Sequence, residues 1–63
     1  MDENLMEMLL EEIAHYRRHD HGPKDMLNIR DHLIKKFSVS KEDALASWRE
    51  YVAIGGDRVF INV

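Results

Sequence analysis

The chain of 63 residues carries 9 Lys+Arg against 12 Asp+Glu, a formal net charge of −3, and 44% of its residues are hydrophobic. This composition is typical of a folded protein, and the length allows one domain, which we expect to span residues 1–63 and which is too small for a large enzyme. Because the chain has no Cys, disulfides, thiolate zinc sites and cysteine nucleophiles are excluded, and the acidic N-terminus and short apolar runs predict a cytoplasmic protein without a signal peptide or membrane span.

The first predicted element is an amphipathic helix over residues 4–20. Charged residues occupy the face opposite to the apolar one, and bases in the last turn complement the helix dipole. Gly22 followed by Pro23 predicts the end of this helix. The residues predicted to point inward recur at three- and four-residue spacing: Leu5, Met6, Leu9, Leu10, Ile13 and Tyr16.

The segment from Pro23 to Phe37 has two interpretations. Either a helix starts near Pro23-Lys24-Asp25 and runs to Phe37, or residues 26–27 form a short strand and Asn28 caps a shorter helix. We favour the second, because Asn28 followed by Asp31 is an acceptable N-terminal pair. Both interpretations bury the same stripe, which is Ile29, Leu33, Ile34 and Phe37.

The start of the next helix is predicted at Ser40, a good N-cap with an acid three residues later. Leu45, Trp48 and Val52 are predicted to point inward, with Ala44 and Tyr51 flanking them and with Trp48 at the centre of the core. Gly55 and Gly56 then end the helix. The last six residues, Arg58-Val59-Phe60-Ile61-Asn62-Val63, alternate as in a half-buried strand, which must pair with residues 26–27 or with a second chain.

The expected fold is therefore mainly α with a minimal β element. Residues 26–48 resemble the winged helix-turn-helix family, because Leu33, Val39, Ser40, Ala44 and Trp48 fall where its pattern expects them. The resemblance implies a three-helix winged-helix-like domain with a C-terminal strand, a truncated wing and a third helix that reads DNA. Ser38 stands where this family usually has glycine.

Charge patterning leaves two functions open. Residues 17–36 hold six cations against three acids, whereas residues 1–16 hold five acids and no cation. A cationic middle favours a small regulatory DNA-binding protein, although the predicted third helix is itself slightly acidic. The alternative is an acidic adaptor or inhibitor on the same fold that binds a basic partner surface, or a cationic segment that is simply solvated. The predicted DNA-binding residues are Arg30, Lys35, Lys36, Lys41, Ser47 and Arg49.

Other features predict no chemistry but do suggest a partner. His15 and His19 lie one turn apart on the first predicted helix. Basic residues at the C-terminal end of a helix commonly do no more than interact favourably with the helix dipole, so we expect no metal. No catalytic signature and no cofactor motif is present, and we expect no enzyme. Met8 widens the apolar face of the first helix, and Phe60 with Ile54 predicts an apolar patch. A homodimer through the first helix or the C-terminal strand would cover these residues.

Overall fold

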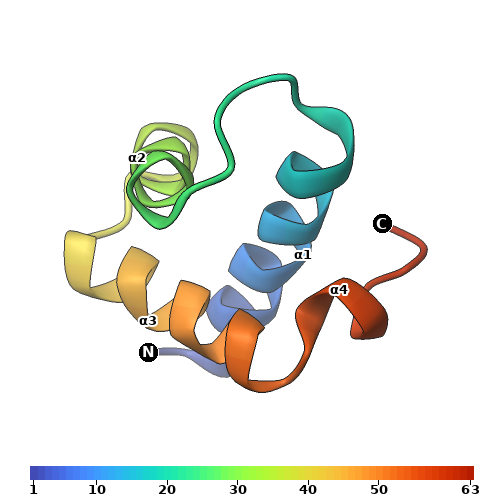
Figure 1. The fold of residues 1–63 in the computed structure, drawn as a ribbon. Helices are drawn as coiled ribbons and strands as arrows, with labels where there is room; N and C mark the ends of the chain where they lie inside the picture. The colour runs from blue at the N-terminus through green and yellow to red at the C-terminus, as the bar shows by residue number, and fades with distance from the viewer.

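The computed structural model describes all of residues 1–63 and contains four helices. They are α1 (Glu3–His19), α2 (Met26–Phe37), α3 (Lys41–Ala53) and the short α4 (Gly56–Val59). Figure 1 shows α2 nearly end-on while α3 runs across the view, so these two helices cross steeply. Helix α1 packs against the other three helices. No helix combines the length and the hydropathy that a membrane span requires.

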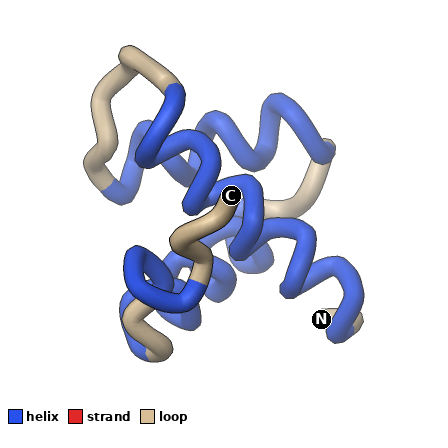
Figure 2. The backbone as a smooth tube through the Cα atoms, turned by 90° about the vertical axis from the view of Figure 1, so that its right-hand side faces the viewer, coloured by secondary structure: helices blue, strands red, loops and turns tan.

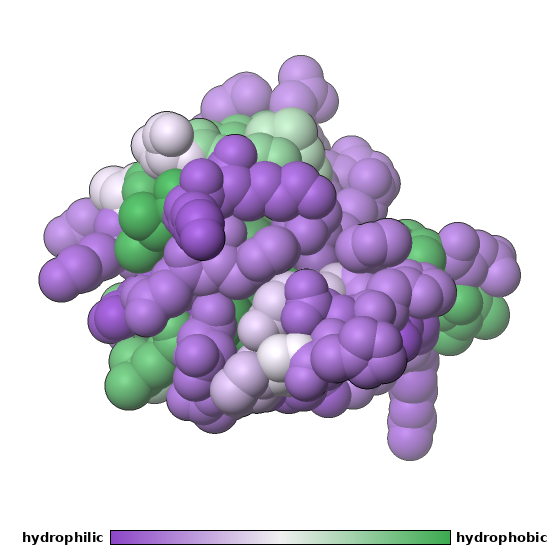
Figure 3. Space-filling view, turned by 90° about the horizontal axis from the view of Figure 1, so that it is seen from above, coloured by the Kyte–Doolittle hydropathy of each residue, from purple (hydrophilic) through white to green (hydrophobic).

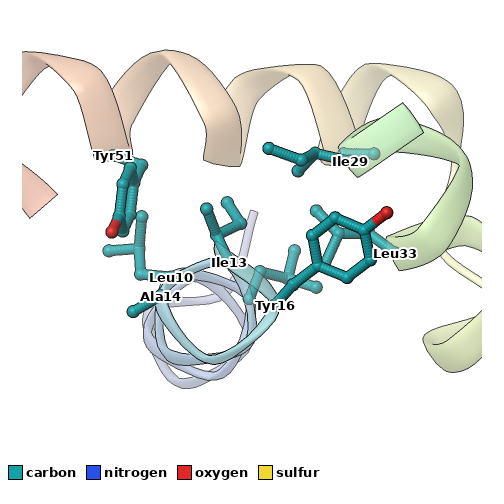
Figure 4. Packing of buried hydrophobic residues seen from close by; sticks show 9 residues of the cluster. Leu10, Ile13, Ala14, Tyr16, Ile29, Leu33 and Tyr51 are labelled. Atoms are coloured by element: carbon teal, nitrogen blue, oxygen red, sulfur yellow. The ribbon is translucent and has the colours of Figure 1, made fainter. Parts of the chain in front are cut away.

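The first helix confirms the prediction from its periodicity. Its N-cap is Asp2, whose carboxylate accepts a hydrogen bond from the Leu5 amide (3.3 Å). Leu9 and Ile13 are fully buried, and the face that carries the predicted charges is exposed. Figure 4 shows Leu10, Ile13 and Tyr16 of α1 beside the core residues of α2 and α3. The core consists of Leu9, Leu10, Ile13, Ala14, Tyr16, Ile29, Leu33, Ala44 and Tyr51.

The predicted short strand at residues 26–27 is wrong, because these residues form the first turn of α2. The helix N-cap is Asp25, and the Asn28 side-chain amide donates to the Asp25 carboxylate instead of capping a helix itself. The alternative interpretation, a helix from near Pro23 to Phe37, is confirmed. Of the predicted inward stripe, Ile29 and Leu33 are fully buried.

In α3 the cap is confirmed but the buried face is not the predicted one. The Ser40 hydroxyl accepts from the Asp43 amide (3.1 Å). The buried residues are Ala44, Ser47 and Tyr51, whereas Trp48 is only partly buried and Val52 is exposed. Two small side chains, Ala44 and Ser47, and the ring of Tyr51 therefore form the buried face of α3, while Trp48 packs at the edge of the core.

The predicted C-terminal strand is wrong, and with it the minimal β element and the winged-helix-like architecture. The structure consists of helices joined by loops and contains no strand, as Figure 2 shows. Gly55 adopts a left-handed conformation (φ 67°) and Gly56 lies against the Tyr51 ring, which turns the chain directly into α4. Residues 26–27 are helical and so offer no edge for pairing. Val59 and Ile61, two residues of the alternating pattern, both have exposed side chains.

Candidate nucleic-acid interface

A sharp turn at residues 38–40 joins α2 to α3. Ser38 has left-handed backbone angles (φ 57°, ψ 33°), the conformation for which glycine is usual, and its amide donates to the Ile34 carbonyl (2.9 Å). Val39 packs partly against the core, and Ser40 caps α3. Steeply crossed helices joined by a turn of about three or four residues are the geometry of a helix-turn-helix unit.

Three of the predicted DNA-binding residues lie free on the surface of this unit. Lys35 is in the last turn of α2, Lys41 is the first residue of α3, and Arg49 lies two turns further along α3. All three are exposed, and none forms an ion pair or a side-chain hydrogen bond. We call Lys35, Lys41 and Arg49 the free cations.

The other three predicted residues have different surroundings. Arg30 forms an ion pair with its neighbour Asp31 (2.8 Å), and Lys36 forms one with Glu12 of α1 (2.9 Å). Ser47 is fully buried and donates its hydroxyl hydrogen bond to the Ala44 carbonyl (2.7 Å). It therefore has no surface with which to reach a base edge, and it does not belong to the interface.

Glu12 connects α1 to α2, a role that no local pattern in the sequence predicts. Its side chain is 10% exposed, and its carboxylate oxygens lie 2.9 Å from Lys36 Nζ and 2.7 Å from His32 Nε2. Burial alone would raise the pKa of Glu12, but the hydrogen bonds from His32 and Lys36 outweigh it and lower this pKa below its ordinary value. The His32 ring also packs on Tyr16, with ring centroids 4.5 Å apart. These contacts hold α2 in place and so orient the turn and α3.

Two arginines that contributed to the cationic middle of the sequence bind the C-terminal segment instead. Arg17 forms two hydrogen bonds of 2.8 Å to the Asp57 carboxylate, and the Tyr51 hydroxyl donates to the same carboxylate (2.6 Å). Arg18 donates to the carbonyls of Asp57 and Phe60. The Arg17 and Tyr51 bonds lower the pKa of Asp57 to about 2, while burial and the bond to Asp57 raise the pKa of Tyr51 to about 12. Both arginines therefore stabilise α4.

Acidic residues border the free cations. Glu42 and Glu50 of α3 are exposed and unpaired. The structure contains no group of three or more His, Cys, Asp or Glu side chains placed to hold a metal ion. His15 and His19 instead lie with ring centroids 4.7 Å apart. The arrangement therefore offers cationic contacts at the helix-turn-helix unit, within a molecule that is acidic as a whole.

Comparison with known proteins gives no relative from which a function follows. No protein-family model, no curated protein and no solved structure matches the chain. The resemblance of residues 26–48 to the helix-turn-helix part of the winged helix-turn-helix family stays a prediction, and the chain continues after α3 with the helix α4 and not with a strand.

Proposed function

We propose that this chain is a small regulatory protein that binds duplex DNA through α2, the turn and α3. The observation that supports this most is the turn itself, in which Ser38 adopts left-handed angles and leaves α3 crossed over α2 with its outer face exposed. The second helix of such a unit lies in the major groove and contacts base edges with its N-terminal residues. The proposal includes the cytoplasmic location expected from the sequence.

The free cations supply the chemistry for this binding. Lys41 begins α3 and so is placed for base edges, and Arg49 carries the guanidinium fork that recognises guanine. Lys35, at the end of α2, is placed for a backbone phosphate. Lys41 and Arg49 also neutralise phosphate charge when α3 enters the groove, so with about three neutralisations the logarithm of the affinity falls against the logarithm of the salt concentration with a slope of about −2.7.

A fluorescence anisotropy titration with mixed-sequence duplex DNA tests the proposal. We expect binding to weaken about 40-fold between about 50 mM and about 200 mM salt, as that slope requires. Lys41→Ala and Arg49→Ala should each weaken binding and make the slope shallower by about 1. Lys24→Met is the control, because it removes a cation from the loop between α1 and α2, outside α2, the turn and α3, and should leave binding unchanged. Since the Lys24 ammonium group donates to the carbonyls of Asp20 and Gly22, circular dichroism of this variant verifies the fold. No binding at low salt would contradict the proposal.

A second candidate function is favoured by the acidic face of α1. Glu3, Glu7 and Glu11 are exposed, lie at four-residue spacing and form no ion pair. Such a face is suited to an adaptor or inhibitor that covers a basic surface of another protein. Binding to a basic protein that is abolished by salt, together with no binding to DNA, would support this candidate over the first.

A further inference from the structure

The C-terminal segment contributes little to the hydrophobic core. We call this segment, residues 56–63, the C-terminal strap, and it comprises α4 and the residues after it. All nine core residues belong to α1, α2 or α3, which together we call the three-helix body. Within the strap only Gly56 is buried, Phe60 and Val63 pack partly against the core, and the other residues are exposed. The core of the three-helix body is therefore complete without the strap.

The backbone hydrogen bonds of the C-terminal strap are all local. The amides of Arg58 and Val59 donate to the Gly55 carbonyl, and those of Phe60 and Val63 donate to carbonyls within the strap. No backbone hydrogen bond joins the strap to α1, α2 or α3. A helix as short as α4 is not stable by itself. Contacts made by side chains must therefore hold the strap in place.

The last turn of α1 supplies most of these contacts. Arg17 donates two hydrogen bonds of 2.8 Å to the Asp57 carboxylate, and Arg18 donates to two carbonyls of the strap. His19 Nε2 lies 3.1 Å from the Val63 carbonyl oxygen. Figure 1 shows the C-terminus beside α1, whose last turn is at the top of the view, and the face seen from above in Figure 3 is mainly hydrophilic. Three consecutive residues of α1 therefore bind the strap through polar groups.

The closed strap covers a basic and aromatic part of the three-helix body. Gly56 lies against the Tyr51 ring, and the ring centroids of Tyr51 and Phe60 are 6.3 Å apart. The Tyr51 hydroxyl donates to the same carboxylate that Arg17 binds. Moving the strap away would free the guanidinium groups of Arg17 and Arg18 and would expose the Tyr51 ring. We call Arg17, Arg18 and Tyr51 the masked surface.

We propose that the C-terminal strap opens as a unit while the three-helix body stays folded, so that the strap controls access to the masked surface. Opening exchanges the contact between Arg17 and Asp57, whose side chains are 29% and 57% exposed, for contacts with water. Unfolding of the three-helix body exposes the whole core. Opening of the strap therefore has the lower free energy. The inference does not depend on DNA binding.

Amide hydrogen exchange of the full chain, followed by nuclear magnetic resonance under conditions that report opening equilibria, tests this proposal. The probes are the Phe60 amide in the strap and the Leu33 amide in the core. We expect the protection of Phe60 to be at least about tenfold lower than that of Leu33, because Phe60 exchanges through the smaller opening. Low concentrations of urea should accelerate the exchange of Leu33 and leave that of Phe60 nearly unchanged, since sensitivity to denaturant follows the surface that an opening exposes.

Two variants separate strap opening from unfolding of the three-helix body. Ile13→Val removes one carbon from the core and should accelerate the exchange of Leu33 about two- to tenfold. It should leave the exchange of Phe60 unchanged, because the body is folded whether the strap is open or closed. Asp57→Asn weakens the contact with Arg17 and should accelerate the exchange of Phe60 at least about threefold. Leu33 should then accelerate by the same factor, because both openings start from the closed state.

Equal protection of the two amides, or acceleration of both by Ile13→Val, would overturn the proposal, because the strap and the core would then unfold together. A Phe60 amide without protection would overturn it as well, since the strap would then not close on α1. Unchanged exchange of Phe60 in Asp57→Asn would contradict the assignment of the contact between Arg17 and Asp57 as the one that holds the strap closed.

Discussion

Replacing Gly56 by Ala should destabilise the domain by crowding Tyr51. A Cβ at this position would lie less than 3.0 Å from three carbons of the Tyr51 ring, whereas carbon atoms in contact prefer about 3.5 Å or more. Contacts oppose a movement of the ring, because its centroid lies 6.0 Å from that of Trp48 and 6.3 Å from that of Phe60 and its hydroxyl donates to Asp57. Helix α4 must therefore shift outward, and the overpacking should cost about 1–3 kcal/mol.

Urea unfolding followed by the fluorescence of the single Trp measures this cost. With a slope of about 1 kcal/mol per molar urea, the midpoint should fall by about 1–3 M. Gly55→Ala is the control: its Cβ meets no atom within 4 Å, and its φ of 67° costs strain without disturbing the Tyr51 ring. The control should therefore lose stability while the native fluorescence of Trp48 stays unchanged. If Gly56→Ala retained the wild-type midpoint and the wild-type native fluorescence, the proposed packing of α4 on Tyr51 would be refuted.

Two further predictions concern Ser38 and Asp57. Ser38→Gly should raise the free energy of unfolding by up to about 1 kcal/mol in a urea titration, because glycine adopts left-handed angles without a Cβ clash; a loss of stability would argue against that conformation. The pKa of Asp57, about 2 against an ordinary 3.8, means that this group stabilises the fold above pH 3.8 and that the contribution is lost as pH falls toward 2. Thermal unfolding over this pH range should therefore show a shallower decline in Asp57→Asn than in the wild type, and identical declines would contradict the Arg17 and Tyr51 contacts.

The parts of the fold that depend on local signals could be predicted from the sequence. The stripe of α1 is amphipathic over its whole length, and Ser40 caps α3 by a bond to a residue only three positions away. The buried face of α3 could not be predicted by residue size, because it consists of the small Ala44 and Ser47 with Tyr51, whereas Val52 is exposed. Periodicity identifies an apolar face only when the bulky residues are the ones that face the core.

The C-terminal segment was predicted wrongly because contacts distant in sequence decide its conformation. Its alternating residues are typical of a strand, but Arg17 reaches Asp57 across 40 positions and Arg18 reaches Phe60 across 42. The candidate interface likewise combines features that follow from local pattern with contacts between residues distant in sequence. Lys41 and Arg49 are exposed as expected from helical geometry, whereas the ion pair of Lys36 with Glu12 joins residues 24 positions apart. No local pattern indicates such a pair.

The most direct test of DNA binding by α2, the turn and α3 is a nuclear magnetic resonance titration of the isotope-labelled chain with duplex DNA. The amide signals of residues 35–49 should shift progressively, with the largest changes near Lys41, while those of residues 57–63 remain in place. Shifts confined to residues 1–11 or 57–63, or no shifts at low salt, would contradict the assignment of the helix-turn-helix unit to DNA.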